Sequence, residues 1–276
     1  MKKLCVIGDP VAHSKSPLIQ NTMIAALGLD YEYTYQTVKR GETTLWLDRV
    51  RSEGWAGFNA TMPHKETLVP YMDELDEDAR LYGAVNTVCS RNGKLYGFNT
   101  DGGGFARALA GANIPIKGTR FVLLGAGGAA KAVALKLAQQ GAGHVTVCNR
   151  TMEKAAALTA HSPDTMTPCG FTLPELSAAC SESDVLVNCT NLGMNGSPDF
   201  ETLDFLNSLP KGAAVCDLIY HPLETSLLKK AKQQGHPAMN GLPLLIHQAI
   251  LALEHFTQTK IDPAAMLPLV EEALGL

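Results

Sequence analysis

Four short polar segments in the N-terminal part of the chain contain side chains that suit a small, polyhydroxylated anion. The segments are residues 14–17 (SKSP), 59–65 (NATMPHK), 83–87 (GAVNT) and 99–101 (NTD). Each adjoins an expected strand, and ligands of open α/β sheets bind beyond the carboxyl ends of strands. We therefore expect the four segments to converge. Taken singly, each also has a structural explanation: Ser16 and Pro17 could merely start a helix, and Asp101 could merely cap one.

A glycine-rich turn lies directly between an expected strand and an expected helix. Residues 119–124 are apolar and β-prone, residues 125–130 read GAGGAA, and strong helix formers follow. In this G-x-G-x-x-A pattern the first glycine permits a tight turn and the second lets the backbone approach a pyrophosphate. Ala130 keeps the helix close to the strand, and the helix N-terminus offers free N–H groups to the anion. The strand and helix around the turn favour dinucleotide binding over a turn formed for packing alone.

The residues after the next expected strand indicate which dinucleotide binds. In NAD enzymes an acidic residue about 20 positions beyond the turn binds the ribose 2′-hydroxyl. Here Asn149, Arg150 and Thr151 follow the strand directly, with Lys154 nearby. A guanidinium pairs with a 2′-phosphate, which a carboxylate would repel. The alternative is a pair of solvated cations, but a helix start disfavours cations, so we predict a preference for NADP.

Short apolar runs alternate with helical patterns along most of the chain, which indicates βαβ units around a mostly parallel sheet. Strands are expected near residues 3–8, 31–38, 56–61, 119–125, 144–148, 185–189 and 213–217, with helices between them such as 17–27, 42–53, 128–140 and 223–235. Residues 85–99 differ, because two β-prone runs flank Asn92 and Gly93, a strong hairpin signal.

The expected fold is α/β with two domains. An N-terminal α/β domain over residues 1–101 contains the four polar segments, and a Rossmann-like domain over residues 102–240 contains the glycine-rich turn. Residues 241–276 read as helices with no strand between them. We expect these helices to pack back on the first domain and to complete it.

Composition and charge exclude several other classes. The 276 residues carry a net charge of −4, so the basic surface that nucleic acid requires is not expected. No apolar run is long enough for a membrane span, and the one after the N-terminal lysines is too short for a signal peptide. The seven cysteines are scattered without a C-x-x-C pair, and no metal-binding spacing occurs. We expect a cytoplasmic monomer or homodimer with small-molecule partners and no bound metal.

Taken together, the motifs strongly resemble those of the shikimate dehydrogenase family, over nearly the whole chain. The matching segments are 14–17, 59–65, 83–87, 99–101, 125–128, 149–151, 188–190 with 193–194, Asp217 with Tyr220 and Pro222, and Gly241 with Gln248. The resemblance implies a reversible, NADPH-dependent reduction of 3-dehydroshikimate to shikimate, a step of aromatic amino acid biosynthesis.

The resemblance also implies roles for individual residues. Lys65 and Asp101 would form the catalytic pair, in which the ammonium protonates the new alkoxide and the carboxylate orients the ammonium. The substrate-binding residues would be Ser14, Ser16, Asn59, Thr61, Asn86, Tyr220 and Gln248. The NADP site would include Glu77, Gly125, Ala126, Gly127, Gly128, Ala129, Asn149, Arg150, Thr151, Lys154, Thr190, Leu218 and Gly241.

Three positions depart from the family's usual pattern, and two rival functions stay open. Ala60 stands in place of a common valine, Pro243 lies at a helix start, and His247 precedes Gln248 where a small residue is usual. One rival is a quinate/shikimate or amino-shikimate dehydrogenase, and the other is a non-catalytic Rossmann-type ligand sensor. Ser14 and Ser16, together with the cation at position 150, argue against the first rival, and the presence of both Lys65 and Asp101 argues against the second.

Overall fold

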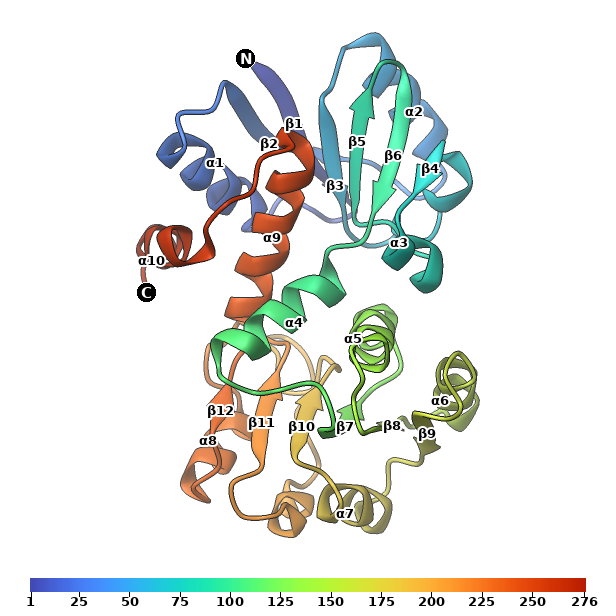
Figure 1. The fold of residues 1–276 in the computed structure, drawn as a ribbon, viewed down its shortest axis with the longest axis vertical. Coiled ribbons are helices and arrows are strands. Elements are labelled where there is room, and N and C mark those ends of the chain that lie inside the picture. Colours follow the sequence, from blue (N-terminus) through green and yellow to red (C-terminus); the bar gives the residue numbers. More distant parts are fainter. The chain divides into compact units, whose positions relative to one another are not determined.

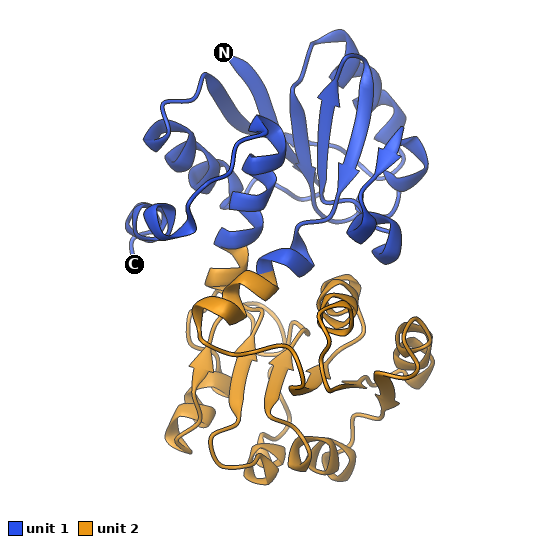
Figure 2. Cartoon of the chain, in the orientation of Figure 1, with its two compact units in different colours: residues 1–104, 246–276 blue, residues 105–245 orange.

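The computed structural model describes residues 1–276 and divides into two compact units (Figure 2). Unit 1 consists of residues 1–104 and 246–276, and unit 2 consists of residues 105–245. The boundaries fall within helices α4 (Asp101–Gly111) and α9 (Leu242–Thr257). Each unit is built on its own six-stranded sheet, which confirms the α/β class expected from the sequence.

The sheet of unit 1 has the strand order β2-β1-β3-β5-β6-β4. Its strands are β1 (Lys2–Gly8), β2 (Tyr31–Thr37), β3 (Gly57–Ala60), β4 (Glu74–Leu75), β5 (Thr87–Arg91) and β6 (Lys94–Phe98). β1 runs parallel to β2 and β3, whereas β5 runs antiparallel to both β3 and β6. The carboxyl ends of β1, β3 and β6 therefore share one edge of the sheet with the start of β5. All four polar segments adjoin that edge, as the sequence predicted.

The predicted hairpin is present between β5 and β6. Asn92 and Gly93 form the two-residue turn, with φ values of 51° and 78°. Two central residues with positive φ match the twist of the flanking strands, and asparagine followed by glycine tolerates them best.

The helices of unit 1 include the C-terminal ones. They are α1 (Ser16–Ala26), α2 (Thr43–Ser52), α3 (Glu77–Tyr82), the start of α4, most of α9, and α10 (Pro263–Leu274), with a 3₁₀ turn at Val69–Tyr71. The Gln20 side chain donates a hydrogen bond to the Ala249 carbonyl over 3.0 Å, and the Phe256 ring lies where a side chain at Gly57 would be. The prediction that the last helices pack back on the first domain is confirmed (Figure 1).

Two glycines let α4 and α9 cross closely within unit 1. A Cβ atom at Gly104 would lie 2.8 Å from the Gln248 backbone nitrogen, and one at Gly103 would lie 3.0 Å from Leu251. Residues 102–104 are all glycine, which costs helix stability but allows this approach. Gln248 is thereby held beside Gly104, in the first turn of α4.

The sheet of unit 2 is entirely parallel, with the order β12-β11-β10-β7-β8-β9 (Figure 1). Its strands are β7 (Arg120–Leu124), β8 (His144–Cys148), β9 (Met166–Cys169), β10 (Val185–Asn188), β11 (Ala214–Asp217) and β12 (Ala238–Met239). The helices of this unit are α5 (Gly128–Gln139), α6 (Met152–Thr159), α7 (Leu173–Ser181) and α8 (Ser226–Gln233), with a 3₁₀ turn at Asp204–Ser208. This is the doubly wound Rossmann order, in which the direction of winding reverses between β7 and β10.

No helix combines the length and the apolar character that crossing a membrane requires. The structure also holds no cluster of three or more histidine, cysteine or acidic side chains placed to bind a metal ion.

Candidate active site

Lys65 and Asp101 are in direct contact. Lys65 Nζ lies 2.6 Å from Asp101 Oδ2, and the two side chains are 32% and 18% exposed. Lys65 lies on the loop after β3, and its carbonyl accepts a hydrogen bond from the Val85 N–H over 2.7 Å. Asp101 is the first residue of α4. The strand order thus brings together two residues that are far apart in the sequence, and leaves them open to a ligand.

Asn86 holds the other oxygen of the Asp101 carboxylate. Its Nδ2 donates to Asp101 Oδ1 over 2.8 Å and to Thr100 Oγ1 over 3.0 Å, while the Thr100 N–H donates to Asn86 Oδ1 over 2.9 Å. Asp101 therefore accepts one hydrogen bond on each oxygen, from a cation and from an amide. This contact is not that of a simple helix cap, the structural alternative for Asp101.

Thr61 lies at the same edge because the neighbouring strand ends in glycine. Its N–H donates to the Ile7 carbonyl over 2.9 Å, and a Cβ at Gly8 would lie only 2.5 Å from Thr61 Cγ2. Any side chain at position 8 would therefore displace the loop that leads to Lys65. The sequence interpretation missed Gly8; a glycine as the last residue of a buried strand was the available signal.

The two serines after β1 form a compact turn. Ser14 Oγ accepts from the Ser16 N–H over 3.2 Å and donates to Ser16 Oγ over 3.1 Å. α1 begins at Ser16, with Lys15 as its N-cap and no side-chain capping bond. Ser16 and Pro17 do start the helix, but the Ser16 side chain does not cap it, and its hydroxyl hydrogen has no recorded acceptor within the chain.

In unit 2 the glycine-rich turn follows β7 at the point where the winding of the sheet reverses. Gly125 has φ +107°, its N–H donates to the Cys148 carbonyl over 2.7 Å, and a Cβ here would lie 3.0 Å from Thr190 Cγ2. Gly127 is the N-cap of α5 and provides no side-chain bond, and Cβ atoms at Gly127 and Gly128 would meet nothing within 4 Å. The start of α5 therefore has no side-chain cap and is not crowded by neighbouring side chains, which fits a pyrophosphate.

The cations after β8 are exposed and uncompensated. Asn149 Nδ2 donates to the Thr151 carbonyl over 2.8 Å, which shapes the turn into α6. Arg150 and Lys154 are exposed and form no recorded ion pair. These side chains are thus available to an anion such as a 2′-phosphate.

Asp217, at the end of β11, connects several segments predicted to contact the cofactor. The side chain is 1% exposed and accepts from Asn188 Nδ2 (3.0 Å), the Ile219 N–H (3.0 Å) and Thr225 Oγ1 (2.7 Å). Asn188 Oδ1, the other end of the same amide, accepts a hydrogen bond from Thr190 Oγ1 over 2.6 Å. Burial raises the pKa of the Asp217 carboxyl to about 6. Its hydrogen bonds act in the opposite direction but are outweighed.

This pKa shift predicts a pH-dependent contribution to stability. Between the ordinary carboxyl pKa of 3.8 and about 6, the folded protein holds a proton on Asp217 that the unfolded chain has lost. Lowering the pH through this window therefore stabilises the native state, and the contribution is lost as the pH rises above about 6. Relative to Asp217→Asn, the wild-type free energy of unfolding should gain up to about 3 kcal/mol between about pH 7 and pH 4. Urea unfolding of both proteins at the two pH values measures this, and parallel pH dependences would contradict it.

The other predicted residues are distributed over both units. Asn59 is buried in β3, Glu77 is exposed at the start of α3 in unit 1, and Tyr220 lies after β11 in unit 2 with 37% of its surface exposed. A Cβ at Gly241 would lie 2.0 Å from the Leu218 carbonyl oxygen, so only glycine fits there. Pro243 lies in the first turn of α9, where proline is tolerated, and His247 is buried.

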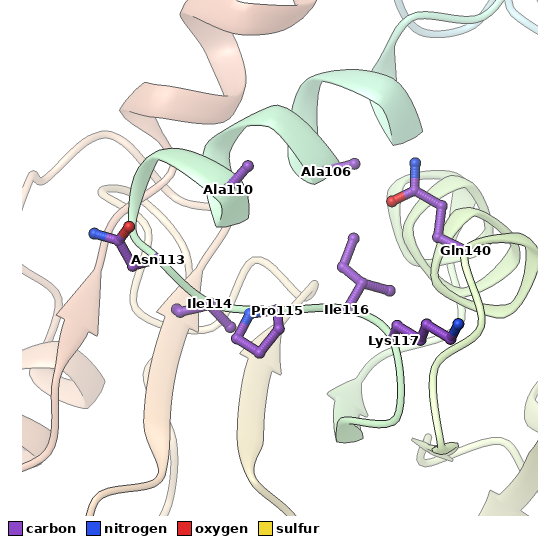
Figure 3. A pocket seen from close by; sticks show the side chains of 8 residues that line it. All are labelled: Ala106, Ala110, Asn113, Ile114, Pro115, Ile116, Lys117 and Gln140. Carbon is purple, nitrogen blue, oxygen red and sulfur yellow. The ribbon is translucent and has the colours of Figure 1, made fainter.

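A groove of about 770 Å³ in unit 2 lies apart from these residues (Figure 3). It is lined by the later part of α4, the linker at residues 113–117 and Gln140. Gln140 follows the C-terminus of α5, whereas the glycine-rich turn precedes the N-terminus of the same helix. The groove is therefore not part of the predicted cofactor site.

Comparison with known proteins identifies the family. The model of the shikimate dehydrogenase substrate binding domain matches residues 6–88, and that of shikimate / quinate 5-dehydrogenase matches residues 108–194. A shikimate dehydrogenase (NADP(+)) of Geobacillus kaustophilus is 40% identical over 98% of this chain and 97% of its own. The chain belongs to the shikimate dehydrogenase family. The resemblance seen in the sequence motifs is confirmed.

Several solved structures are similar to this chain along nearly its whole length. Shikimate 5-dehydrogenase of Listeria monocytogenes, in complex with shikimate and NAD, has a TM-score of 0.90 at 30% identity, covering 98% of this chain and 96% of that one. The Thermus thermophilus enzyme, with NADP(H) and shikimate, has a TM-score of 0.86 at 36% identity, covering 99% and 100%. A 5-ketofructose reductase of Gluconobacter has a TM-score of 0.86 at 34% identity, covering 98% of both chains.

Proposed function

We propose that this protein reduces 3-dehydroshikimate reversibly to shikimate with NADPH. The observation that carries the proposal is the contact of 2.6 Å between Lys65 and Asp101, in a chain that matches shikimate dehydrogenase (NADP(+)) along its length. Unit 1 contains the catalytic pair and most of the substrate-binding residues in this proposal, and unit 2 contains most of the NADP-binding residues. The seven cysteines are free thiols, which fits a reducing compartment such as the cytoplasm.

Lys65 performs the proton transfer in this proposal. Its ammonium donates a proton to the oxygen of the substrate carbonyl as negative charge develops there, and stabilises that charge. In the reverse direction the neutral amine removes the proton from the hydroxyl. Asp101 accepts a hydrogen bond from the ammonium and so fixes its position, and Asn86 fixes Asp101. Because Lys65 is partly exposed, it exchanges its proton with solvent between turnovers.

In this proposal, substrate and cofactor bind to polar groups whose hydrogen-bonding or charge partners are not already supplied by the chain. The Ser16 hydroxyl hydrogen, which has no recorded acceptor, suits the substrate carboxylate, with the Ser14 hydroxyl next to it. Thr61 and Gln248 are the further residues of unit 1 that we propose for substrate binding. NADPH, whose dihydronicotinamide supplies the hydride, fits the open N-terminus of α5 and the exposed cation at position 150.

Steady-state assays of the purified protein test this function against its rivals. Reduction by NADPH is measured with 3-dehydroshikimate and 5-ketofructose, and oxidation by NADP with shikimate and quinate. We expect kcat/KM for shikimate to exceed that for quinate by at least about 10²-fold, because quinate carries an additional hydroxyl on a tetrahedral carbon that is planar in shikimate, and a site shaped for shikimate would bury that hydroxyl without a partner. The same margin is expected for 3-dehydroshikimate over 5-ketofructose.

Two outcomes would contradict the proposal. A preference for quinate or 5-ketofructose would show that the protein catalyses a different reaction from the one proposed, on the same fold. Binding of shikimate without turnover of any of the four compounds would favour the ligand sensor.

A further inference from the structure

A buried tyrosine lies at the far end of a chain of hydrogen bonds that leads to Asp101. Tyr33, in β2, is 1% exposed, and its hydroxyl donates to Asn59 Oδ1 over 2.7 Å. We infer that Tyr33 is a positioning residue that fixes the orientation of the Asp101 carboxylate, and hence of Lys65, through the buried side chains between them. The inference rests on the proposed catalytic pair. Tyr33 itself is separated from that pair by Asn59, Thr87 and Asn86.

The backbone determines which way the Asn59 amide points. Asn59 Nδ2 donates to the Asn86 carbonyl over 3.0 Å and to Thr87 Oγ1 over 2.9 Å. A carbonyl oxygen can only accept, so the amino group must face it and Oδ1 must face Tyr33. The phenol is therefore the donor, and the structure records no other donor to that oxygen.

The same reasoning fixes the Asn86 amide. Its Oδ1 accepts from the Thr100 N–H over 2.9 Å, and a backbone N–H can only donate. Nδ2 must then face Asp101 Oδ1, 2.8 Å away. Thr87 Oγ1 accepts from Asn59, so its own hydrogen goes to Asn86 Oδ1 over 2.8 Å.

Every bond in the chain therefore has the same polarity. Tyr33 donates to Asn59, Asn59 to Thr87, Thr87 to Asn86, and Asn86 to Asp101. Hydrogen bonds aligned in this way polarise and strengthen one another inside a protein. The final acceptor is the carboxylate that also binds the Lys65 ammonium.

Burial makes the first bond difficult to replace. The four side chains from Tyr33 to Asn86 are all buried, so water cannot substitute for a missing donor. Burial also raises the pKa of the Tyr33 hydroxyl well above its ordinary value, with the Cys5 thiol adding to the effect. The hydroxyl thus remains a donor over the whole working pH range.

Only tyrosine combines the reach and the hydroxyl that this position needs. β1 lies between β2 and β3, so the phenol of Tyr33 spans one strand to reach Asn59. Serine or threonine would be too short, and phenylalanine lacks the donor. Tyr35, on the same face of β2, provides a contrast: it is 48% exposed and its hydroxyl has no recorded partner.

The Tyr33→Phe variant tests the inference, with Tyr35→Phe as the matched control. Loss of the hydroxyl leaves Asn59 Oδ1 without a donor and loosens the hold on Asp101. We expect kcat for 3-dehydroshikimate to fall about 10-fold, because small misplacements of catalytic groups have effects of that order. KM should change by less than about twofold, since the substrate's own contacts stay. The control should match wild type in both constants.

Substitutions at Thr87 separate positioning from general destabilisation. Thr87→Val breaks the chain at its middle and should lower kcat as Tyr33→Phe does, whereas Thr87→Ser keeps the hydroxyl and should retain wild-type kcat. In the double variant Tyr33→Phe/Thr87→Val the two losses should not multiply, since both break one network. Multiplicative losses, or a Tyr33→Phe variant that loses thermal stability but keeps kcat, would overturn the inference.

A readout without turnover distinguishes this inference from the proposed function. Hydrogen exchange of the Asn86 side-chain amide, followed by NMR, should accelerate in Tyr33→Phe and not in Tyr35→Phe. Unchanged exchange in Tyr33→Phe would overturn the positioning role whatever the reaction is. If exchange accelerates in Tyr33→Phe as predicted but the wild-type protein shows no turnover, the positioning role stands and the proposed function is contradicted.

Discussion

We expect the replacement of Lys65 by methionine to lower kcat for 3-dehydroshikimate by at least about 10²-fold and to alter KM far less. Methionine keeps the length and apolar stem of the side chain but removes the ammonium. The developing alkoxide then has neither a proton donor nor a cation next to it, and the loss is felt in the transition state rather than in substrate binding. Steady-state kinetics in both directions, with circular dichroism to verify folding, measure the effect.

Lys39→Met is the matched control for this variant. Lys39 is also in unit 1, is exposed, and forms no recorded side-chain hydrogen bond or ion pair, so its replacement changes the net charge equally. It should leave kcat unchanged. A Lys65→Met enzyme with near wild-type kcat would show that the proton comes from another group.

We expect the replacement of Arg150 by aspartate to reverse the preference between NADPH and NADH. We expect kcat/KM for NADPH to fall by about 10²-fold or more, because a bidentate cation–phosphate contact is lost and a like charge takes its place. NADH carries a hydroxyl where NADPH has the 2′-phosphate, so its kcat/KM should change little or rise. Shikimate 5-dehydrogenase of Listeria monocytogenes, which shares this fold, has been crystallised in complex with shikimate and NAD.

Lys211→Asp serves as the control for charge reversal. Lys211 is exposed in the turn before β11, at the opposite edge of the sheet of unit 2 from the glycine-rich turn. Its replacement changes the net charge as Arg150→Asp does but should affect both cofactors equally and weakly. Equal losses of NADPH and NADH activity in Arg150→Asp would contradict a 2′-phosphate contact.

Most elements of the fold could be predicted because they bury continuous apolar runs or have unmistakable turn residues. The parallel strands at 120–124 and 185–188 and the turn at Asn92 and Gly93 are of this kind. The sequence analysis missed the short strands β4, β9 and β12. These strands have two to four residues at sheet edges, and Pro168 interrupts one of them, so periodicity has too few positions to reveal them.

The proposed catalytic pair could be named from the sequence, whereas the side chains that position it could not be recognised as such. Lys65 and Asp101 belong to motifs that local spacing preserves. Tyr33 lies in a strand that reads YEYTYQT, and nothing local tells which of its three tyrosines points inward to a polar partner. Asp217 was noticed as part of a motif, but its role as a buried acceptor for Asn188 and Thr225 depends on the packing of distant segments.

A single-turnover experiment tests most directly whether the Lys65 ammonium protonates the substrate during its reduction. The affinities of wild-type protein and Lys65→Met for both ligands are first measured by calorimetry. Each protein, saturated with NADPH, is then mixed rapidly with 3-dehydroshikimate, and the absorbance of NADPH is followed. We predict near-equal affinities and a rate of NADPH oxidation at least about 10²-fold lower in the variant. Oxidation at the wild-type rate in Lys65→Met, or none in the wild-type protein, would contradict the account.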